Sequence, residues 1–156
     1  MIGEVCTLNN IDNKELVEVI TKLILEKLQQ SDGKIIKEVD SSGVISIKGS
    51  TVKCEPFDTG RAGDKVYLKD ILSLDESPRL GCGFMEMKNS SFPWTLKYDE
   101  IDYIIEGTLE IIINGNKIRG NAGDVIFIPM NSSIEFSAPD YAKFIYITYP
   151  ANWVNL

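Results

Sequence analysis

The sequence contains no histidine, and its three cysteines, Cys6, Cys54 and Cys82, lie far apart in the 156 residues. Histidine and cysteine side chains hold most zinc, copper and iron ions in proteins, and they do so in clusters. The sequence therefore predicts no bound transition metal, and it excludes a Ser-His-Asp catalytic triad. An odd number of separated cysteines also argues against a disulfide framework, so we expect reduced thiols in a soluble, cytoplasmic protein.

Basic residues are fewer than acidic residues, 16 against 23, which gives a net charge of -7. Nucleic acids and anionic membranes attract basic surfaces, so we expect neither as a partner. No apolar run is long enough to span a bilayer, and no signal peptide is recognisable. Glycine-rich phosphate loops are also missing: no Walker-A motif occurs, and residues 81–83 read Gly-Cys-Gly without the third glycine of the dinucleotide fingerprint.

A helical pattern occupies residues 12–30, where Asp12 and Glu15 have the spacing of a capping box. Its apolar side chains recur at spacings of three and four residues: Leu16, Ile20, Leu23, Ile24 and Leu28. We predict that residues 1–50 form this amphipathic helix and a polar connector, and that residues 51–156 form a separate domain.

From residue 51 onward, short segments rich in β-branched and aromatic residues are separated by turn residues. These predicted strands lie at 66–68, 83–87, 103–105, 109–113, 125–129, 134–136 and 144–149, after a first short strand at 44–48. Asn114-Gly115 is typical of a tight hairpin, because both residue types tolerate a positive φ. No long helical pattern separates the strands, so we predict an all-β antiparallel barrel or sandwich.

Several longer motifs are more specific. They are Pro-Phe-Asp at 56–58, Phe-Pro-Trp-Thr-Leu-Lys-Tyr-Asp-Glu-Ile-Asp at 92–102, Gly-Asp-Val-Ile-Phe-Ile-Pro at 123–129 and Tyr-Pro-Ala-Asn-Trp at 149–153. Residues 51–156 resemble the ethanolamine-utilisation protein EutQ family, which belongs to the cupin superfamily. The resemblance implies a double-stranded β-helix, a cupin-like jelly-roll barrel, preceded by the N-terminal amphipathic α-helix.

The resemblance also locates the usual cupin metal site. The glutamate of the first cupin motif corresponds to Glu100. Six residues lie between it and Gly107, the glycine of the motif. The three histidine positions of the two motifs are occupied here by Trp94, Leu96 and Ile134. One carboxylate does not hold a catalytic transition metal, so we do not expect a metal-dependent dioxygenase.

Residues of equal parity share one face of a strand, so the former ligand positions and their neighbours should line the barrel mouth. We predict catalytic roles for Glu100, Asp102 and Tyr98, and binding roles for Trp94, Leu96 and Lys97. The alternatives are that Trp94 and Leu96 fill the core, and that the acids at 99, 100 and 102 are solvated turn charges. A turn near residue 98 would break the parity, and Glu135 should point outward.

The family resemblance implies a place in bacterial ethanolamine catabolism within a protein-shelled microcompartment. It also implies an acetate kinase activity, which interconverts acetyl phosphate and ADP with acetate and ATP. In that case Glu100 and Asp102 would hold Mg²⁺ beside ATP or ADP, and Lys53, Lys97 and Arg61 are candidates for the phosphates. The alternative is a catalytically inert cupin scaffold or assembly factor of the microcompartment.

Two kinds of partner are expected. Cupins pair through outer sheet faces, so the resemblance implies a homodimer in which Ile101, Tyr103 and Ile105 form an apolar face. The amphipathic helix at 12–30 would dock on a shell protein or a pathway enzyme. The alternative is that this helix packs on its own barrel or on the dimer mate.

Overall fold

The computed structural model describes residues 13–31 and 34–155. Its α-helix, α1 (Asn13–Ser31), confirms the predicted helix, whereas the capping residue Asp12 lies outside the described residues. Apolar side chains of α1 such as Leu16 and Leu23 are exposed. Residues 35–156 form a second unit, and docking of the helix on a partner stays a prediction. In the described part of the chain, no helix is both long and apolar enough to cross a bilayer.

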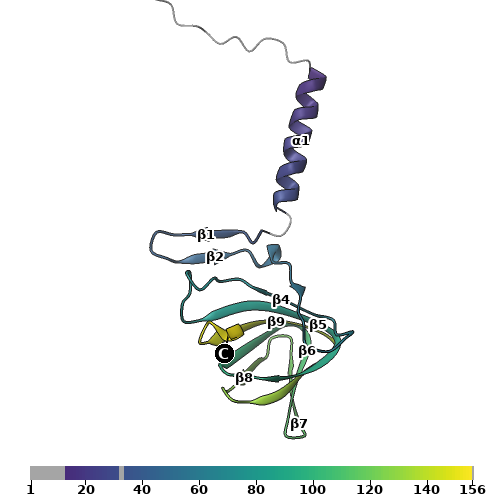
Figure 1. Cartoon of the computed structure of the whole chain (residues 1–156), viewed down its shortest axis with the longest axis vertical. Helices are drawn as coiled ribbons and strands as arrows, with labels where there is room; N and C mark the ends of the chain where they lie inside the picture. Colours follow the sequence, from purple (N-terminus) through teal and green to yellow (C-terminus); the bar gives the residue numbers. More distant parts are fainter. Residues whose placement is uncertain (1–12, 32–33, 156) are drawn as a thin grey trace, which may run out of the picture. The chain divides into compact units, whose positions relative to one another are not determined.

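Nine strands form two antiparallel sheets in the described residues of the second unit (Figure 1). They are β1 (Lys37–Val39), β2 (Ile45–Ile47), β3 (Glu55–Pro56), β4 (Val66–Asp70), β5 (Gly81–Thr95), β6 (Asp99–Ile113), β7 (Asn116–Asn121), β8 (Val125–Ile128) and β9 (Ser133–Tyr149). The first two pair with each other, and the other seven follow the order β3-β4-β5-β9-β6-β7, with β8 pairing with β6. Short 3-10 turns occupy Gly49–Thr51 and Trp153–Asn155. The all-β jelly-roll prediction is confirmed.

Each of the three longest strands, β5, β6 and β9, is continuous where the sequence pattern predicts shorter strands. The predicted strands at 103–105 and 109–113 form one strand, β6, whose pairing with β9 shifts register on both sides of residues 106–107. Such irregularities let a long strand bend from one face of a barrel to the other. The predicted hairpin is confirmed, since Asn114 and Gly115 join β6 to β7 with φ angles of 51° and 78°.

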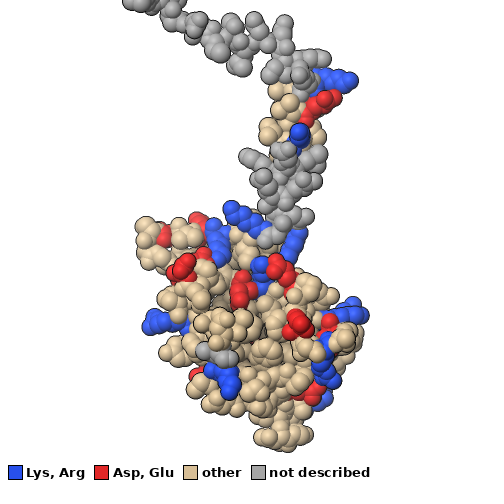
Figure 2. Space-filling model, viewed as in Figure 1, with Lys and Arg blue, Asp and Glu red and all other residues tan. Residues whose placement is uncertain are grey.

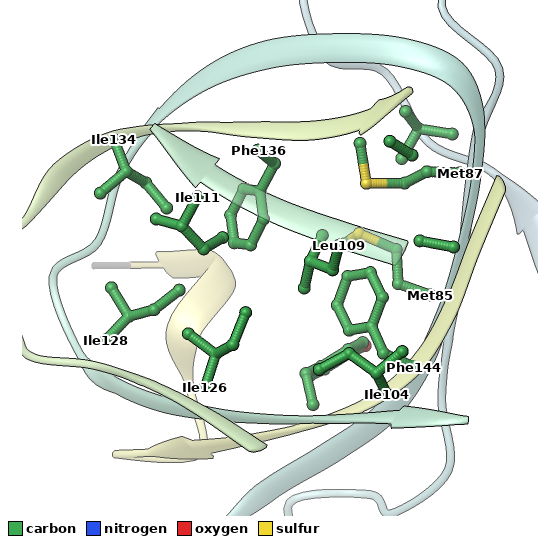
Figure 3. Packing of buried hydrophobic residues seen from close by; sticks show 14 of the residues in the cluster. Met85, Met87, Ile104, Leu109, Ile111, Ile126, Ile128, Ile134, Phe136 and Phe144 are labelled. Carbon is green, nitrogen blue, oxygen red and sulfur yellow. The ribbon is translucent and has the colours of Figure 1, made fainter. Parts of the chain in front are cut away.

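Alternate side chains of the long strands fill the barrel interior (Figure 3). Phe136 lies at the centre of this core, with its ring stacked on Phe92 at 5.4 Å and on Phe144 at 6.4 Å between centroids. Ile104 and Leu109 from β6 are fully buried close by. Removing this apolar surface from water is the main source of the barrel's stability.

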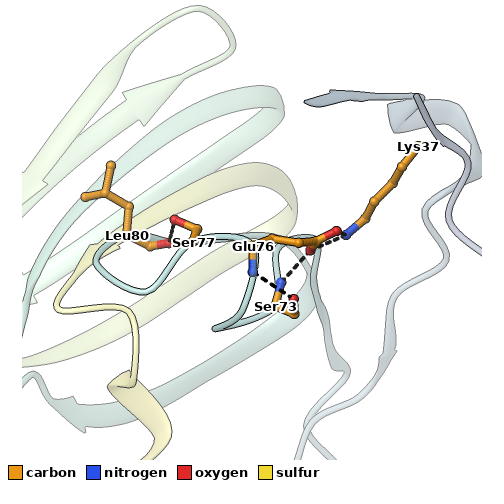
Figure 4. Close-up of polar contacts among 5 residues, drawn as sticks. All are labelled: Lys37, Ser73, Glu76, Ser77 and Leu80. Carbon is orange, nitrogen blue, oxygen red and sulfur yellow. Dashed lines mark hydrogen bonds and ion pairs between the residues drawn. The ribbon is translucent and has the colours of Figure 1, made fainter. Parts of the chain in front are cut away.

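An ion pair links the small sheet to the connection between β4 and β5 (Figure 4). Lys37 on β1 places its Nζ 2.6 Å from Oε2 of Glu76, which lies in the connection between β4 and β5. Glu76 also accepts a hydrogen bond from the backbone N–H of Ser73 at 2.8 Å. The hydrogen bond from Lys37 is the main cause of the lowered pKa of Glu76. The two side chains are 21% and 27% exposed, and an ion pair at the surface stabilises a protein by at most about 1 kcal/mol.

Candidate functional site

One end of the barrel contains a small cavity of about 20 Å³ that opens to solvent. The described side chains that line it are Phe57, Met85, Phe92, Trp94, Tyr98, Glu100, Phe136, Tyr146 and Trp153. Strands β5, β6 and β9 supply most of them, and Tyr98 comes from the β5–β6 connection. A small cavity with aromatic walls and one carboxyl group is typical of a small-ligand site.

The structure brings three of the predicted site residues together in this cavity. Trp94, Tyr98 and Glu100 line it, and the indole N–H of Trp94 donates a hydrogen bond to the Tyr98 hydroxyl at 2.9 Å. Leu96 is fully buried in the core, and Asp102 is fully buried next to Glu100 along the strand. Burial at 96, 98, 100 and 102 shows that the turn before β6 does not break the predicted parity.

Lys97 has the opposite orientation. It is exposed and lines an outer pocket together with Trp94, Tyr98 and Trp153, which also line the inner cavity. The opening of the barrel therefore has an aromatic rim with a lysine on its outer side.

Glu100 and Asp102 are 5% and 0% exposed, which excludes the alternative of solvated charges for these two acids. Among the described residues, no lysine or arginine forms an ion pair with either acid, and Asp102 has no hydrogen-bond partner other than the neighbouring carboxyl group of Glu100. Burial raises the pKa of Glu100 to about 7. Burial and, next, the neighbouring Glu100 raise the pKa of Asp102 well above its usual value.

Asp99, in contrast, closes a turn. Its carboxylate accepts a hydrogen bond from the backbone N–H of Met130 at 2.7 Å, so it joins the start of β6 to the loop after β8. This contact gives Asp99 a structural role outside the cavity.

Sequence reasoning missed a second polar group at the cavity. The hydroxyl of Tyr146 donates to Oδ1 of Asp70 at 2.7 Å, and the indole N–H of Trp153 donates to the same oxygen at 3.3 Å. Burial is the main cause of the raised pKa of Tyr146, with Asp70 the next cause. Trp153 belongs to the Tyr-Pro-Ala-Asn-Trp motif and Phe57 to the Pro-Phe-Asp motif, so both had a signal in the sequence.

The candidate phosphate ligands lie outside the cavity. Arg61 donates to the carbonyl of Ser91 at 2.6 Å and lies 3.6 Å from the carboxylate of Glu135, which is on the outer face as predicted. Lys53 is exposed. On the face in Figure 2, lysine and arginine are interspersed with acidic side chains over the second unit. No described lysine or arginine lines the inner cavity.

The acid pair suits a resident Mg²⁺ poorly. Mg²⁺ takes six oxygen ligands and usually keeps several waters. Only Glu100 of the pair reaches the cavity, and in the described chain no three potential ligands form a cluster.

The family model described as "Ethanolamine utilisation protein EutQ" matches residues 11–155. A relative named acetate kinase EutQ, from Clostridioides difficile (strain 630), is 50% identical over 95% of this chain and 98% of its own length. The solved structure of the Clostridium difficile EutQ protein has a TM-score of 0.75 and 57% identity, over 77% of this chain and 90% of that chain.

A more distant solved structure supports the fold alone. It is a cupin superfamily protein from Desulfitobacterium hafniense DCB-2, with a TM-score of 0.51 and 17% identity over 65% of this chain and 85% of that chain. The jelly-roll fold, the replaced histidine positions and the family match over residues 11–155 all indicate the same family. The chain belongs to the EutQ family of ethanolamine utilisation proteins and has a cupin fold.

Proposed function

We propose that this protein is an acetate kinase that transfers the phosphoryl group between acetyl phosphate and ADP. The observation that carries the proposal is the 50% identity, over 98% of its length, to a relative named for that activity. Association with a microcompartment and docking of residues 12–30 on a shell protein or pathway enzyme are part of the same proposal. Membership in the ethanolamine utilisation family supports the place in this pathway, and the exposed apolar side chains of α1, such as Leu16 and Leu23, support the docking.

Charge indicates where the phosphates would bind. Acetyl phosphate and ADP are polyanions, and phosphoryl transfer depends on positioning and on neutralising their charge. The inner cavity is unsuitable because Glu100 faces it and no described basic side chain does. We place the phosphates at the rim, where Lys97 lies beside Trp94 and Tyr98. In this arrangement Mg²⁺ enters bound to the nucleotide. Tyr98 and Glu100 position the reactants from the inner side of the rim. Asp102 acts through its neighbour Glu100.

Lys97→Ala is expected to lower kcat/KM for acetyl phosphate at least tenfold, since a charge-assisted contact to phosphate contributes about 1.5–3 kcal/mol. Coupled detection of ATP formed from acetyl phosphate and Mg·ADP measures this. Lys65→Ala, which removes an exposed lysine outside the rim, is the matched control and should leave the rate unchanged. Absence of ATP formation by the folded wild-type protein would reject the kinase function. Full activity of a Glu100→Ala, Asp102→Ala double variant would reject the site alone.

A second candidate, a non-catalytic scaffold or assembly factor, is favoured by the outer face of the barrel. Ile101 lies opposite Phe127 and Tyr103 lies opposite Val125 on the adjacent strands β6 and β8. The four side chains are 41%, 59%, 46% and 62% exposed, and Ile105 extends the same row at 41%. Such a contiguous apolar face is typical of a protein interface, and we propose a second copy of this chain as its occupant.

Phe127→Glu is expected to convert a dimer into a monomer, because it would bury two carboxylates at the proposed symmetric interface. Light scattering on the purified protein measures the mass. Leu74→Glu is the control, since Leu74 is a similarly exposed apolar residue outside this face. A wild-type protein that is monomeric at high concentration, or a dimeric Phe127→Glu variant, would contradict the proposed face.

A further inference from the structure

The walls of the inner cavity are mostly aromatic. Its rings meet edge to face: Phe57 and Trp94 lie 5.7 Å apart, and Tyr98 and Tyr146 lie 5.9 Å and 6.0 Å from Trp153 between centroids. Aromatic faces carry partial negative charge, and several of them around one space attract an ammonium group. The hydrogen bond between Trp94 and Tyr98 fixes two of these rings in place.

The polar groups at the cavity wall and behind it favour the same class of ligand. Glu100 is the one charged side chain among the described residues that line it. Thr148, directly opposite Glu100 on β9, is buried and its hydroxyl has no hydrogen-bond partner. Buried Asp102, behind Glu100, has no partner other than the carboxyl group of Glu100. Ionising a buried carboxyl group without a cation is costly, and a ligand that brings positive charge would offset that cost.

We propose that this cavity binds a small primary alkylammonium ion, with its ammonium group on Glu100 and its carbon atoms against Trp94 and Trp153. The cavity itself is only about 20 Å³, room for a group the size of a water molecule, so the ammonium group enters it and the carbon atoms lie at its mouth, where Trp94 and Trp153 also line the outer pocket. The ammonium group has three N–H donors, and Glu100 and the hydroxyl of Tyr146 are acceptors in the wall. Ethanolammonium has the required size and charge. The inference does not depend on the kinase activity.

Binding should strengthen with pH, because only ionised Glu100 pairs with the cation. The pKa of Glu100 is about 7, and the titratable groups around it are Asp102, Tyr98 and Tyr146, with Asp70 behind Tyr146. Primary alkylammonium ions stay charged up to about pH 9, as lysine does. The ionised fraction of Glu100 rises about tenfold between pH 6 and pH 8, and the affinity should rise by a similar factor.

Isothermal titration calorimetry of the full chain with ethanolamine hydrochloride tests the proposal. We expect saturable 1:1 binding at pH 8, about tenfold weaker binding at pH 6, and none with 1,2-ethanediol, which has nearly the same shape without the charge. Two results would overturn the proposal. One is the absence of saturable binding at ethanolamine concentrations up to about 10 mM, which corresponds to a weak affinity. The other is equal binding of 1,2-ethanediol.

Variants assign the binding to this cavity. Glu100→Gln should weaken ethanolamine binding more than tenfold, whereas Glu106→Gln, which removes an exposed carboxylate from the same strand, should not change it. Trp153→Leu, which removes a ring from the wall, should weaken binding without changing any charge. Unchanged affinity in folded Glu100→Gln or Trp153→Leu protein would place the amine elsewhere and overturn the assignment. Kinase activity is measured separately, so failure of one proposal does not imply failure of the other.

Discussion

A Glu100→Gln, Asp102→Asn double variant is expected to be more stable than the wild-type protein at pH 8. Both acids have a raised pKa in the folded state, chiefly because they are buried, and the value for Glu100 is about 7. The folded protein therefore binds protons more tightly than the unfolded chain. The associated stability is fully present below the unfolded pKa of about 4.3 and is lost as pH rises through about 7.

The expected loss is on the order of 3 kcal/mol for Glu100 alone, since each pKa unit corresponds to about 1.4 kcal/mol. Urea unfolding at pH 5 and at pH 8 measures it. The wild-type free energy of unfolding should fall between these values, and that of the double variant should change little. Acids with lowered pKa, such as Glu76, lose their contribution only below pH 5 and do not interfere. Equal pH dependence in both proteins would show that the pair is neutralised by another group.

The control for this experiment is Glu106→Gln. Glu106 lies on the same strand but is exposed, so its substitution removes one carboxylate without removing a buried one. Its unfolding curves should follow the wild type at both pH values. A change like that of the double variant would mean that net charge, and not burial, sets the pH dependence.

The sequence could predict the local features of this barrel. Alternation of side chains predicted that Tyr98, Glu100 and Asp102 share one face of the strand at the barrel mouth; all three are buried, and Tyr98 and Glu100 line the cavity. The Asn114-Gly115 pair predicted its hairpin for the same kind of reason, because the required backbone angles depend on those two residues alone. Such predictions succeed where one strand or one turn holds all the information.

Features that depend on distant contacts could not be predicted. The hydrogen bonds that hold Asp70 to Tyr146 and to Trp153 join residues 76 and 83 positions apart, and no local pattern specifies them. The sequence also divided β6 and β9 into shorter strands, because the polar residues at their bends resemble turn residues. The aromatic walls of the cavity come from several strands, so their convergence appears only in the folded chain.

Gly107→Ala is expected to destabilise the protein by about 3 kcal/mol or more. Gly107 has a φ of 76°, a region in which a Cβ costs about 1–2 kcal/mol. That Cβ would also overlap the carbonyl oxygen of Tyr141, with the carbonyl carbon 2.7 Å away. The obstruction is backbone on the neighbouring strand β9, where Gly107 pairs with Ala142, so no side chain can rotate to relieve it. Overpacking of this kind costs about 1–3 kcal/mol more.

Gly115→Ala separates the two causes. Gly115 has nearly the same φ, 78°, but nothing lies within 4 Å of the position of its Cβ. Its substitution should therefore cost only the backbone strain of about 1–2 kcal/mol. Urea unfolding of the two variants compares them directly. A Gly107→Ala protein no less stable than Gly115→Ala would mean that β6 and β9 separate at this point without cost. A much larger loss would explain why the glycine of the first cupin motif stands at this position: it lets two long strands cross in contact where both bend.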